Sequence, residues 1–194
     1  MPSDALDVAL AAARAFESTG IAYFLGGSMA SSLQGEPRAT NDIDFVLDLR
    51  EEQIAPLMAA LGPDFDVDEH ALAEAVRQQG SWNVFFAPLM IKIDLFVLGR
   101  TPFDASEFAR RRRMLVREDA ELFVKSPEDS VLRKLRWFKD GGSVSTNQWR
   151  DVVEILRINA GALEDAYLDE WAPRLDVAAE LASAREQANG STAG

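Results

Sequence analysis

The chain has 194 residues, of which 47% are hydrophobic and 27% charged, a composition that excludes general disorder. It contains no cysteine and a single histidine, which excludes a disulfide scaffold, a thiolate zinc site, a cysteine nucleophile and a multi-histidine metal site. The formal net charge of −12 argues against a nucleic-acid-binding surface over the whole chain. Any metal would be held mainly by carboxylates, a ligand set that favours Mg²⁺ or Mn²⁺.

The charge is unevenly distributed along the chain. Residues 1–70 carry 3 basic and 13 acidic groups, whereas residues 110–139 carry 10 basic and 5 acidic groups. An acidic first lobe and a basic later segment would separate a metal site from a phosphate site. The alternative is that Arg110 to Arg113 form only a solvated helix end.

The first half of the chain is expected to mix helices and strands. Asp4 is placed to cap a helix that ends before Gly20, and a short apolar run rich in strand formers follows. From Asp42 onward, apolar and acidic residues alternate, which predicts a strand with an acidic face at its start. The expected helices span residues 5–18, 28–34, 51–61 and 69–79, and the expected strands span residues 21–25, 42–49, 81–87 and 89–98.

The second half is expected to be mostly helical. Ser126, followed by Pro127 and two acidic residues, is a strong signal for a helix start. The expected elements are a helix over 103–112, paired strands over 114–116 and 122–124, and helices over 127–139, 147–159, 163–171 and 176–188.

This order of elements predicts an α+β fold of α/β type, with a small mixed sheet and a helical C-terminal half. The expected domains are a core over residues 1–125, a helical region over 126–188 and a disordered tail over 189–194. The N-terminus is acidic, and no apolar run approaches the ~18 residues of a membrane span. We therefore expect a soluble, cytoplasmic protein without membrane partners.

Three motifs carry candidate chemistry. Gly26-Gly27-Ser28 lies between a strand and a helix, where glycines let the backbone approach a ligand and a helix N-terminus suits phosphate. Asp42 and Asp44 share one face of a strand, and Asp94 stands inside another apolar strand. If the two strands are neighbours, the three carboxylates meet and form a site for one or two divalent cations.

Each motif also has a plainer interpretation. Gly26-Gly27 can be a simple turn. The aspartate pair can lie on a solvated strand edge, although burying two like charges in an apolar strand would be costly without a cation. Asp94 can form a salt bridge to Lys92, which is two residues away on the same face.

In combination, these motifs resemble the nucleotidyltransferase superfamily of DNA-polymerase-beta-like fold. The stretch Arg38-x-Thr40-Asn41-Asp42-Ile43-Asp44 is similar to the extended motif of abortive-infection and other toxin-type nucleotidyltransferases. The resemblance covers about residues 20–160. The runs that carry it are Phe24-Leu25-Gly26-Gly27-Ser28, Asp42-Ile43-Asp44-Phe45, Ile93-Asp94-Leu95, Ser126-Pro127-Glu128-Asp129, Lys134-Leu135 and Arg150-Asp151-Val152-Val153.

The resemblance implies a metal-dependent transfer of a nucleoside monophosphate from an NTP to an acceptor hydroxyl, with release of pyrophosphate. Asp42, Asp44 and Asp94 would bind Mg²⁺ or Mn²⁺, and Asp94 would also help to deprotonate the acceptor. The turn formed by Gly26, Gly27 and Ser28 would hold the β- and γ-phosphates.

By the same resemblance, four more residues contact the nucleotide: Arg38, Thr40, Lys134 and Asp151. Lys134 is also expected to stabilise the departing pyrophosphate and so to act in catalysis. The alternatives are a loop charge for Arg38, a lysine whose stem lies on the core for Lys134, and a surface acid for Asp151. We expect Lys134 to take part in no buried ion pair, so that its removal abolishes transfer while the fold survives.

Three functions are open at this stage. The first is a toxin-type nucleotidyltransferase that acts on RNA or another macromolecule, with an antitoxin as a candidate partner. The second is a small-molecule nucleotidyltransferase of the antibiotic-modifying type, for which an acidic surface suits a cationic acceptor. The third is a non-catalytic nucleotide-binding domain, against which the three intact aspartates argue.

Overall fold

The computed structural model describes residues 2–37 and 39–190. The chain divides into two compact units. The sheet unit consists of Met1–Met29 and Thr40–Lys125, and the helical unit consists of Ala30–Ala39 and Ser126–Gly194. Residues 30–39 were expected in the first domain, but Gln34 accepts hydrogen bonds from Ser130 Oγ (2.6 Å) and, through its carbonyl, from Asn159 Nδ2 (2.8 Å), which ties this segment to the helical unit.

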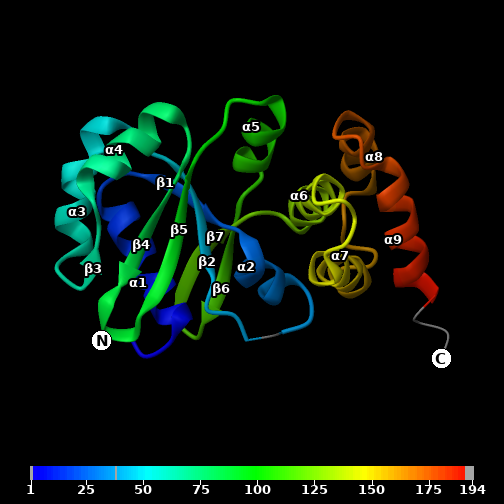
Figure 1. The fold of residues 1–194 in the computed structure, drawn as a ribbon. Helices are drawn as coiled ribbons and strands as arrows, with labels where there is room; N and C mark the ends of the chain where they lie inside the picture. Colours follow the sequence, from blue (N-terminus) through cyan, green and yellow to red (C-terminus); the bar gives the residue numbers. More distant parts are fainter. Residues whose placement is uncertain (1, 38, 191–194) are drawn as a thin grey trace. The chain divides into compact units, whose positions relative to one another are not determined.

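Within the described residues, seven strands form one mixed sheet in the order β3-β4-β5-β2-β1-β7-β6 (Figure 1). β2 pairs with β5 in parallel and β1 pairs with β7 in parallel, whereas the other neighbours are antiparallel. The strands are β1 (Ala22–Leu25), β2 (Ile43–Asp48), β3 (Phe65–Asp66), β4 (Ser81–Phe86), β5 (Ile91–Val97), β6 (Arg112–Arg117) and β7 (Ala120–Val124).

The helices of the sheet unit pack on both faces of the sheet. Asp4 caps the first helix by accepting a hydrogen bond from the Asp7 N–H at 2.8 Å. Phe16 of this helix packs on Phe45, with ring centroids 5.2 Å apart, and Tyr23 packs against both rings. The helices are α1 (Ala5–Ser18), α2 (Gly27–Gln34), α3 (Ile54–Leu61), α4 (Glu69–Gln78) and α5 (Pro102–Ala109), and α2 continues into the helical unit.

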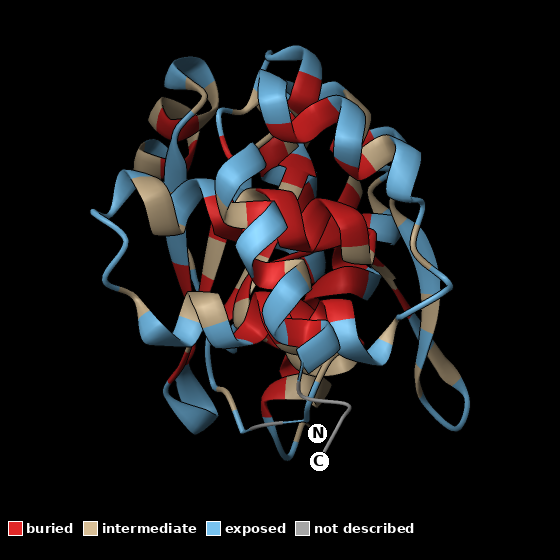
Figure 2. Cartoon of the chain, turned by 90° about the vertical axis from the view of Figure 1, so that its right-hand side faces the viewer, coloured by how far each residue is buried: buried red, intermediate tan, exposed pale blue. Residues whose placement is uncertain are grey.

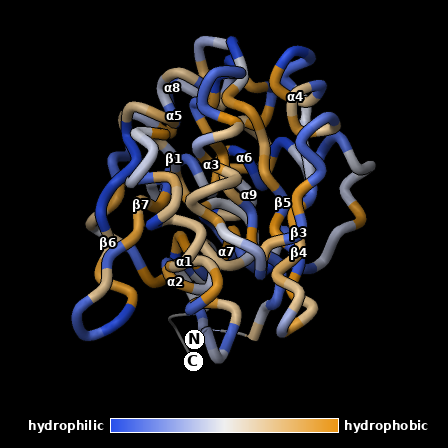
Figure 3. Tube along the Cα trace, turned by 90° about the vertical axis from the view of Figure 1, so that its left-hand side faces the viewer, coloured by the Kyte–Doolittle hydropathy of each residue, from blue (hydrophilic) through white to orange (hydrophobic). Residues whose placement is uncertain are grey.

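The two faces of the central strands differ in chemistry. In β2, Ile43, Phe45 and Leu47 are buried on the face that packs against α1, while Asp44 points to the opposite face. Hydrophobic residues mark β5 in Figure 3, in contrast to the hydrophilic turn between β6 and β7. The alternation therefore puts carboxylates on the less buried face of an otherwise apolar sheet centre.

Four helices build the rest of the helical unit in the described part of the chain. Ser126 caps α6 as expected, its Oγ accepting from the Asp129 N–H at 3.1 Å. The helices bury apolar stripes against one another, and Figure 2 shows buried residues concentrated on their inner faces. They are α6 (Pro127–Asp140), α7 (Thr146–Ile158), α8 (Asp165–Arg174) and α9 (Ala178–Gly190).

The predicted fold class, a mixed sheet with helices and a helical C-terminal half, is confirmed. The two-residue strand β3 was missed because so short a strand leaves no alternating pattern in the sequence. The tail was expected to begin at residue 189, whereas α9 continues through Gly190, and residues 191–194 lie outside the described part. No helix in residues 2–37 or 39–190 is long and apolar enough to cross a membrane.

Candidate functional site

The centre of the sheet brings two of the predicted carboxylates side by side. β2 and β5 are parallel neighbours, and their register pairs Asp44 directly with Asp94. Paired residues of adjacent strands lie about 4.8 Å apart and point to the same face. Both side chains lie on the less buried face, since Ile43 and Ile93, which precede them, are buried on the other.

Asp42 stands just before the first residue of β2, although the sequence placed it inside the strand. Its side chain is exposed, and its backbone N–H donates to Thr40 Oγ1 at 3.2 Å. Thr40, a predicted nucleotide contact, therefore orients the chain that leads into β2. Arg38, another predicted nucleotide contact, lies outside the described residues.

The electrostatics of Asp44 show that negative charge accumulates here. Burial raises the pKa of Asp44 above its ordinary value, and the charges of Asp94 and Asp42 raise it further. The ammonium groups of Lys125 and Lys92 oppose this effect, but the net direction of the pKa shift is upward. A cation bound among these carboxylates would relieve the repulsion.

The predicted glycine turn lies directly against this carboxylate. Gly26 N–H donates to the Asp44 carbonyl at 2.8 Å, which ties the end of β1 to β2. A Cβ atom on Gly27 would lie 1.8 Å from Asp44 Oδ2, and its φ of +58° also favours glycine. The N-terminus of α2, with Gly27 as its first residue and Ser28 as its second, therefore begins beside Asp44.

Lys92 takes part in the arrangement as the alternative interpretation proposed. Its Nζ lies 2.7 Å from Asp94 Oδ2, and hydrogen bonding to Asp94 raises the pKa of Lys92. Within residues 2–37 and 39–190, no three carboxylate or histidine side chains stand in a ready-made metal cluster. The side-chain oxygens of Asp42, Asp44 and Asp94 suit a hard cation in kind, but Asp94 is engaged by Lys92.

Two buried residues near the turn were missed by the sequence analysis. Lys125 follows β7, and its backbone N–H donates to Leu25 O at 3.2 Å because β7 runs parallel to β1. Its Nζ lies 3.6 Å from Glu107 Oε1, with side-chain exposures of 2% and 5%. The lysine is also about 3.9 Å (Cε) from where a Cβ of Gly26 would be. In the sequence, the one feature that could have pointed to Lys125 is its position, as a charged residue directly after an apolar strand.

Lys134 and Asp151 lie in the helical unit and bind each other. Lys134 Nζ is 2.9 Å from Asp151 Oδ2, and the side chains are only 4% and 7% exposed. The expectation that Lys134 takes part in no buried ion pair is therefore wrong, as is the alternative that Asp151 is a surface acid. The packing of α6 on α7, which sequence periodicity does not encode, brings the two side chains together.

Comparisons with known proteins agree with this architecture. No protein-family model matches the chain, and no curated protein sequence matches it. The antibiotic-resistance factor ANT(2'')-Ia has a similar structure, with a TM-score of 0.52 and 14% identity, over 90% of this chain and 93% of that chain. An antigenic nucleotidyltransferase-like protein from Paracoccidioides brasiliensis is similar with a TM-score of 0.51 and 16% identity, over 94% of this chain and 92% of that one.

The chain has the nucleotidyltransferase fold. The similarity extends over nearly the full length of both relatives, so both units of this chain have counterparts in a nucleotidyltransferase-like protein. The fold by itself does not identify the substrates.

Proposed function

We propose that the chain catalyses metal-dependent transfer of a nucleoside monophosphate from an NTP to an acceptor hydroxyl. The observation that carries the proposal is the register pair Asp44 and Asp94, with the Gly27 backbone packed against Asp44. Like charges are costly to place together in an apolar sheet, and a bound divalent cation would offset that cost. The raised pKa of Asp44 supports the same interpretation.

The residues divide the work as follows in this proposal. Asp42, Asp44 and Asp94 would hold Mg²⁺ or Mn²⁺, which when bound would neutralise charge on the phosphates. The backbone N–H groups at the start of α2, from Gly27 onward, would bind the outer phosphates. Asp94 would accept the proton of the acceptor hydroxyl as its oxygen bonds to the α-phosphorus and pyrophosphate leaves.

Two classes of acceptor are candidates for the proposed reaction: a macromolecule such as RNA and a small cationic molecule. The toxin-type resemblance points to RNA or another macromolecule, with an antitoxin as partner. A macromolecular acceptor such as RNA would need free basic surface, and the structure pairs three of the arginines after residue 109 internally. Arg111 stacks on Phe108 (4.2 Å to the ring centroid), Arg113 lies 3.2 Å from Glu121, and Arg117 bonds Asp4.

A small cationic acceptor is therefore the candidate that we favour. The net charge of −12 disfavours RNA, and the paired arginines provide little free basic surface. The similarity to an antibiotic-resistance factor over 90% of this chain supports this choice. The macromolecular acceptor remains the second candidate, on the strength of the Arg38 to Asp44 motif.

One labelling experiment tests function and acceptor together. The purified chain is incubated with each α-labelled NTP and Mg²⁺, together with total RNA, with a panel of polyamine and aminosugar compounds, or with neither. We expect label on a small cationic compound, and none with Asp44→Asn. Asp48→Asn, an exposed residue of the same strand, is the matched control and should retain activity. Label on RNA would overturn the preferred acceptor, and no label on any acceptor with intact NTP binding would support a non-catalytic nucleotide-binding domain.

A further inference from the structure

One ammonium group lies among the three carboxylates of the sheet unit. Lys92 stands two residues before Asp94 on β5, so both side chains are on the same face of the sheet. The Lys92 Nζ is 2.7 Å from Asp94 Oδ2. The parallel register pairs Ile43 with Ile93, and its extension by one residue places Asp42 across from Lys92. The lysine therefore has an acidic neighbour on its own strand and another across from it.

The charges of these groups act on one another. The hydrogen bond to Asp94 raises the pKa of Lys92, and the charges of all three aspartates act in the same direction. Lys92 is thus a cation held by the carboxylates that the proposed reaction assigns to a metal. Its ammonium occupies one oxygen of Asp94 that a metal ion would need.

The two lysines that act on Asp44 differ in their freedom to move. The Lys125 side chain is 2% exposed and lies beside the equally buried Glu107, so the packing of the sheet unit holds it in place. The Lys92 side chain is 43% exposed. A lysine on a flexible four-carbon stem exchanges its partner easily when the ion pair is open to solvent. Lys92 can therefore leave Asp94, whereas Lys125 is fixed.

We propose that Lys92 is a resident counter-ion, a positive charge of the chain itself that competes with a divalent cation for Asp94. Its ammonium holds Asp94 Oδ2 in the metal-free chain, and Lys92 must release this oxygen before Asp94 binds a metal ion. A binding-competent state that is only partly populated lowers the apparent affinity in proportion. Lys92 is a positioning residue, because it acts through Asp94. The inference rests on the proposed function only in taking the three aspartates as metal ligands.

Titration of the intact chain with Mn²⁺ alone tests the inference. The electron paramagnetic resonance signal of free Mn²⁺ is followed for the wild type and for Lys92→Met, which keeps an apolar side chain and removes the charge. We expect Lys92→Met to bind Mn²⁺ at least about 10-fold more tightly, because Asp94 is then always released. Lys92→Arg keeps a cation and should bind Mn²⁺ no more tightly than the wild type. Adding Asp44→Asn to Lys92→Met should remove the gain, which locates the ion at the sheet carboxylates.

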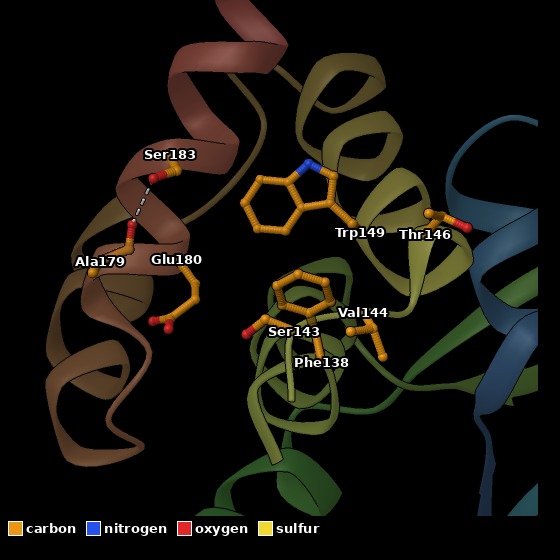
Figure 4. A pocket seen from close by; sticks show the side chains of 8 residues that line it. All are labelled: Phe138, Ser143, Val144, Thr146, Trp149, Ala179, Glu180 and Ser183. Atoms are coloured by element: carbon orange, nitrogen blue, oxygen red, sulfur yellow. Dashed lines mark hydrogen bonds between the residues drawn. The ribbon is translucent and has the colours of Figure 1, made fainter. Parts of the chain in front are cut away.

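Lys139→Met is the matched control. Lys139 is also a partly exposed lysine held by acidic side chains, with its Nζ 3.0 Å from Asp176 Oδ2 and 3.7 Å from Glu180 Oε1. Glu180 lines a pocket formed by the end of α6, α7 and α9 of the helical unit, which Figure 4 shows. The substitution removes the same charge from the chain and should leave Mn²⁺ affinity unchanged. An equal gain in Lys139→Met would reflect net charge alone and would overturn the inference.

The remaining outcomes separate this inference from the transfer reaction, because Mn²⁺ binding is measured without NTP or acceptor. Equal or weaker Mn²⁺ binding by Lys92→Met would overturn the inference even if the chain transfers nucleotide. Tighter binding by Lys92→Met, together with no transfer to any acceptor, would support the inference and contradict the proposed reaction. No binding by either protein at millimolar Mn²⁺ would overturn the metal site and the competition with it.

Discussion

The two units differ in how they accommodate charged side chains of low solvent exposure. In the sheet unit, Asp44 lies in register with Asp94 and near Asp42, and burial together with these negative charges raises its pKa. In the helical unit, Asp151 lies 2.9 Å from Lys134, and each charge has its opposite. Buried charges that are paired need no ligand, whereas accumulated like charges are relieved by one. We infer that the ion pair of the helical unit is satisfied within the fold, and that the sheet carboxylates are the better candidate for a ligand site.

The largest effect is expected from the like charges. Asp44→Asn should reduce nucleotidyl transfer by on the order of 10⁴-fold, because it removes the carboxylate charge that we propose holds the metal while keeping the side-chain shape. Its unfolding free energy should not fall, since a repelled carboxylate is neutralised. Transfer rates and urea unfolding measure the two quantities. A variant with full activity would show that the carboxylates of the sheet are not the site.

The ion pair of the helical unit should respond in the opposite way. Lys134→Ala removes the ammonium group that balances the buried Asp151 carboxylate, which should lower the unfolding free energy by about 3–5 kcal/mol. The double variant Lys134→Met with Asp151→Leu should regain most of that stability. Arg174→Ala, which removes an exposed partner of Glu170, serves as the control and should cost less than about 1 kcal/mol. A stable Lys134→Ala protein that has lost transfer would make the pair functional and break the comparison.

Substitution of Gly27 tests the comparison in a different way, because an added Cβ atom would displace the Asp44 carboxylate. In Gly27→Ala, strain at φ +58° and the 1.8 Å clash with Asp44 Oδ2 must both be accommodated. The expected cost is about 1–3 kcal/mol, together with weaker Mg²⁺ and NTP binding. Gly20→Ala has a similar φ, +68°, but nothing within 4 Å of its Cβ, so it reports the strain alone. Unchanged ligand affinity in Gly27→Ala would contradict the close approach of backbone and carboxylate.

The smallest expected effect concerns pH. The pKa of Asp44 is raised in the folded protein from its ordinary value of 3.8, so protonation favours folding and this contribution is lost as the pH rises above that value. In EDTA, Asp44→Asn should therefore gain stability over the wild type from pH 3.8 upward, reaching its full advantage once Asp44 is ionised. Mg²⁺ should narrow the gap by stabilising the ionised wild type. Urea titrations at several pH values measure the difference in unfolding free energy between the variant and the wild type. A difference that grows toward low pH would contradict the predicted direction of the pKa shift.

Local patterns in the sequence predicted the face on which Asp44 and Asp94 lie, because strand alternation is visible residue by residue. They did not predict the pairing partners. The register between β2 and β5 depends on how distant segments assemble, and so does the approach of Lys125 to Glu107. The same holds for Lys134 and Asp151, which lie on two helices whose facing sides are determined by packing. The sequence pattern therefore does not predict which side chains of different helices and strands contact each other.

The ends of the sheet order have a consequence for how the protein behaves in concentrated solution. One edge strand, β3, has only two residues, and the other, β6, carries Arg112, Arg113 and Arg117 and a register irregularity between Leu115 and Arg117. A short edge offers little backbone to a second molecule, and an irregular edge lined by charged side chains does not pair readily with its own copy. The sheet is thereby protected against edge-to-edge aggregation, although its central strands are strongly apolar.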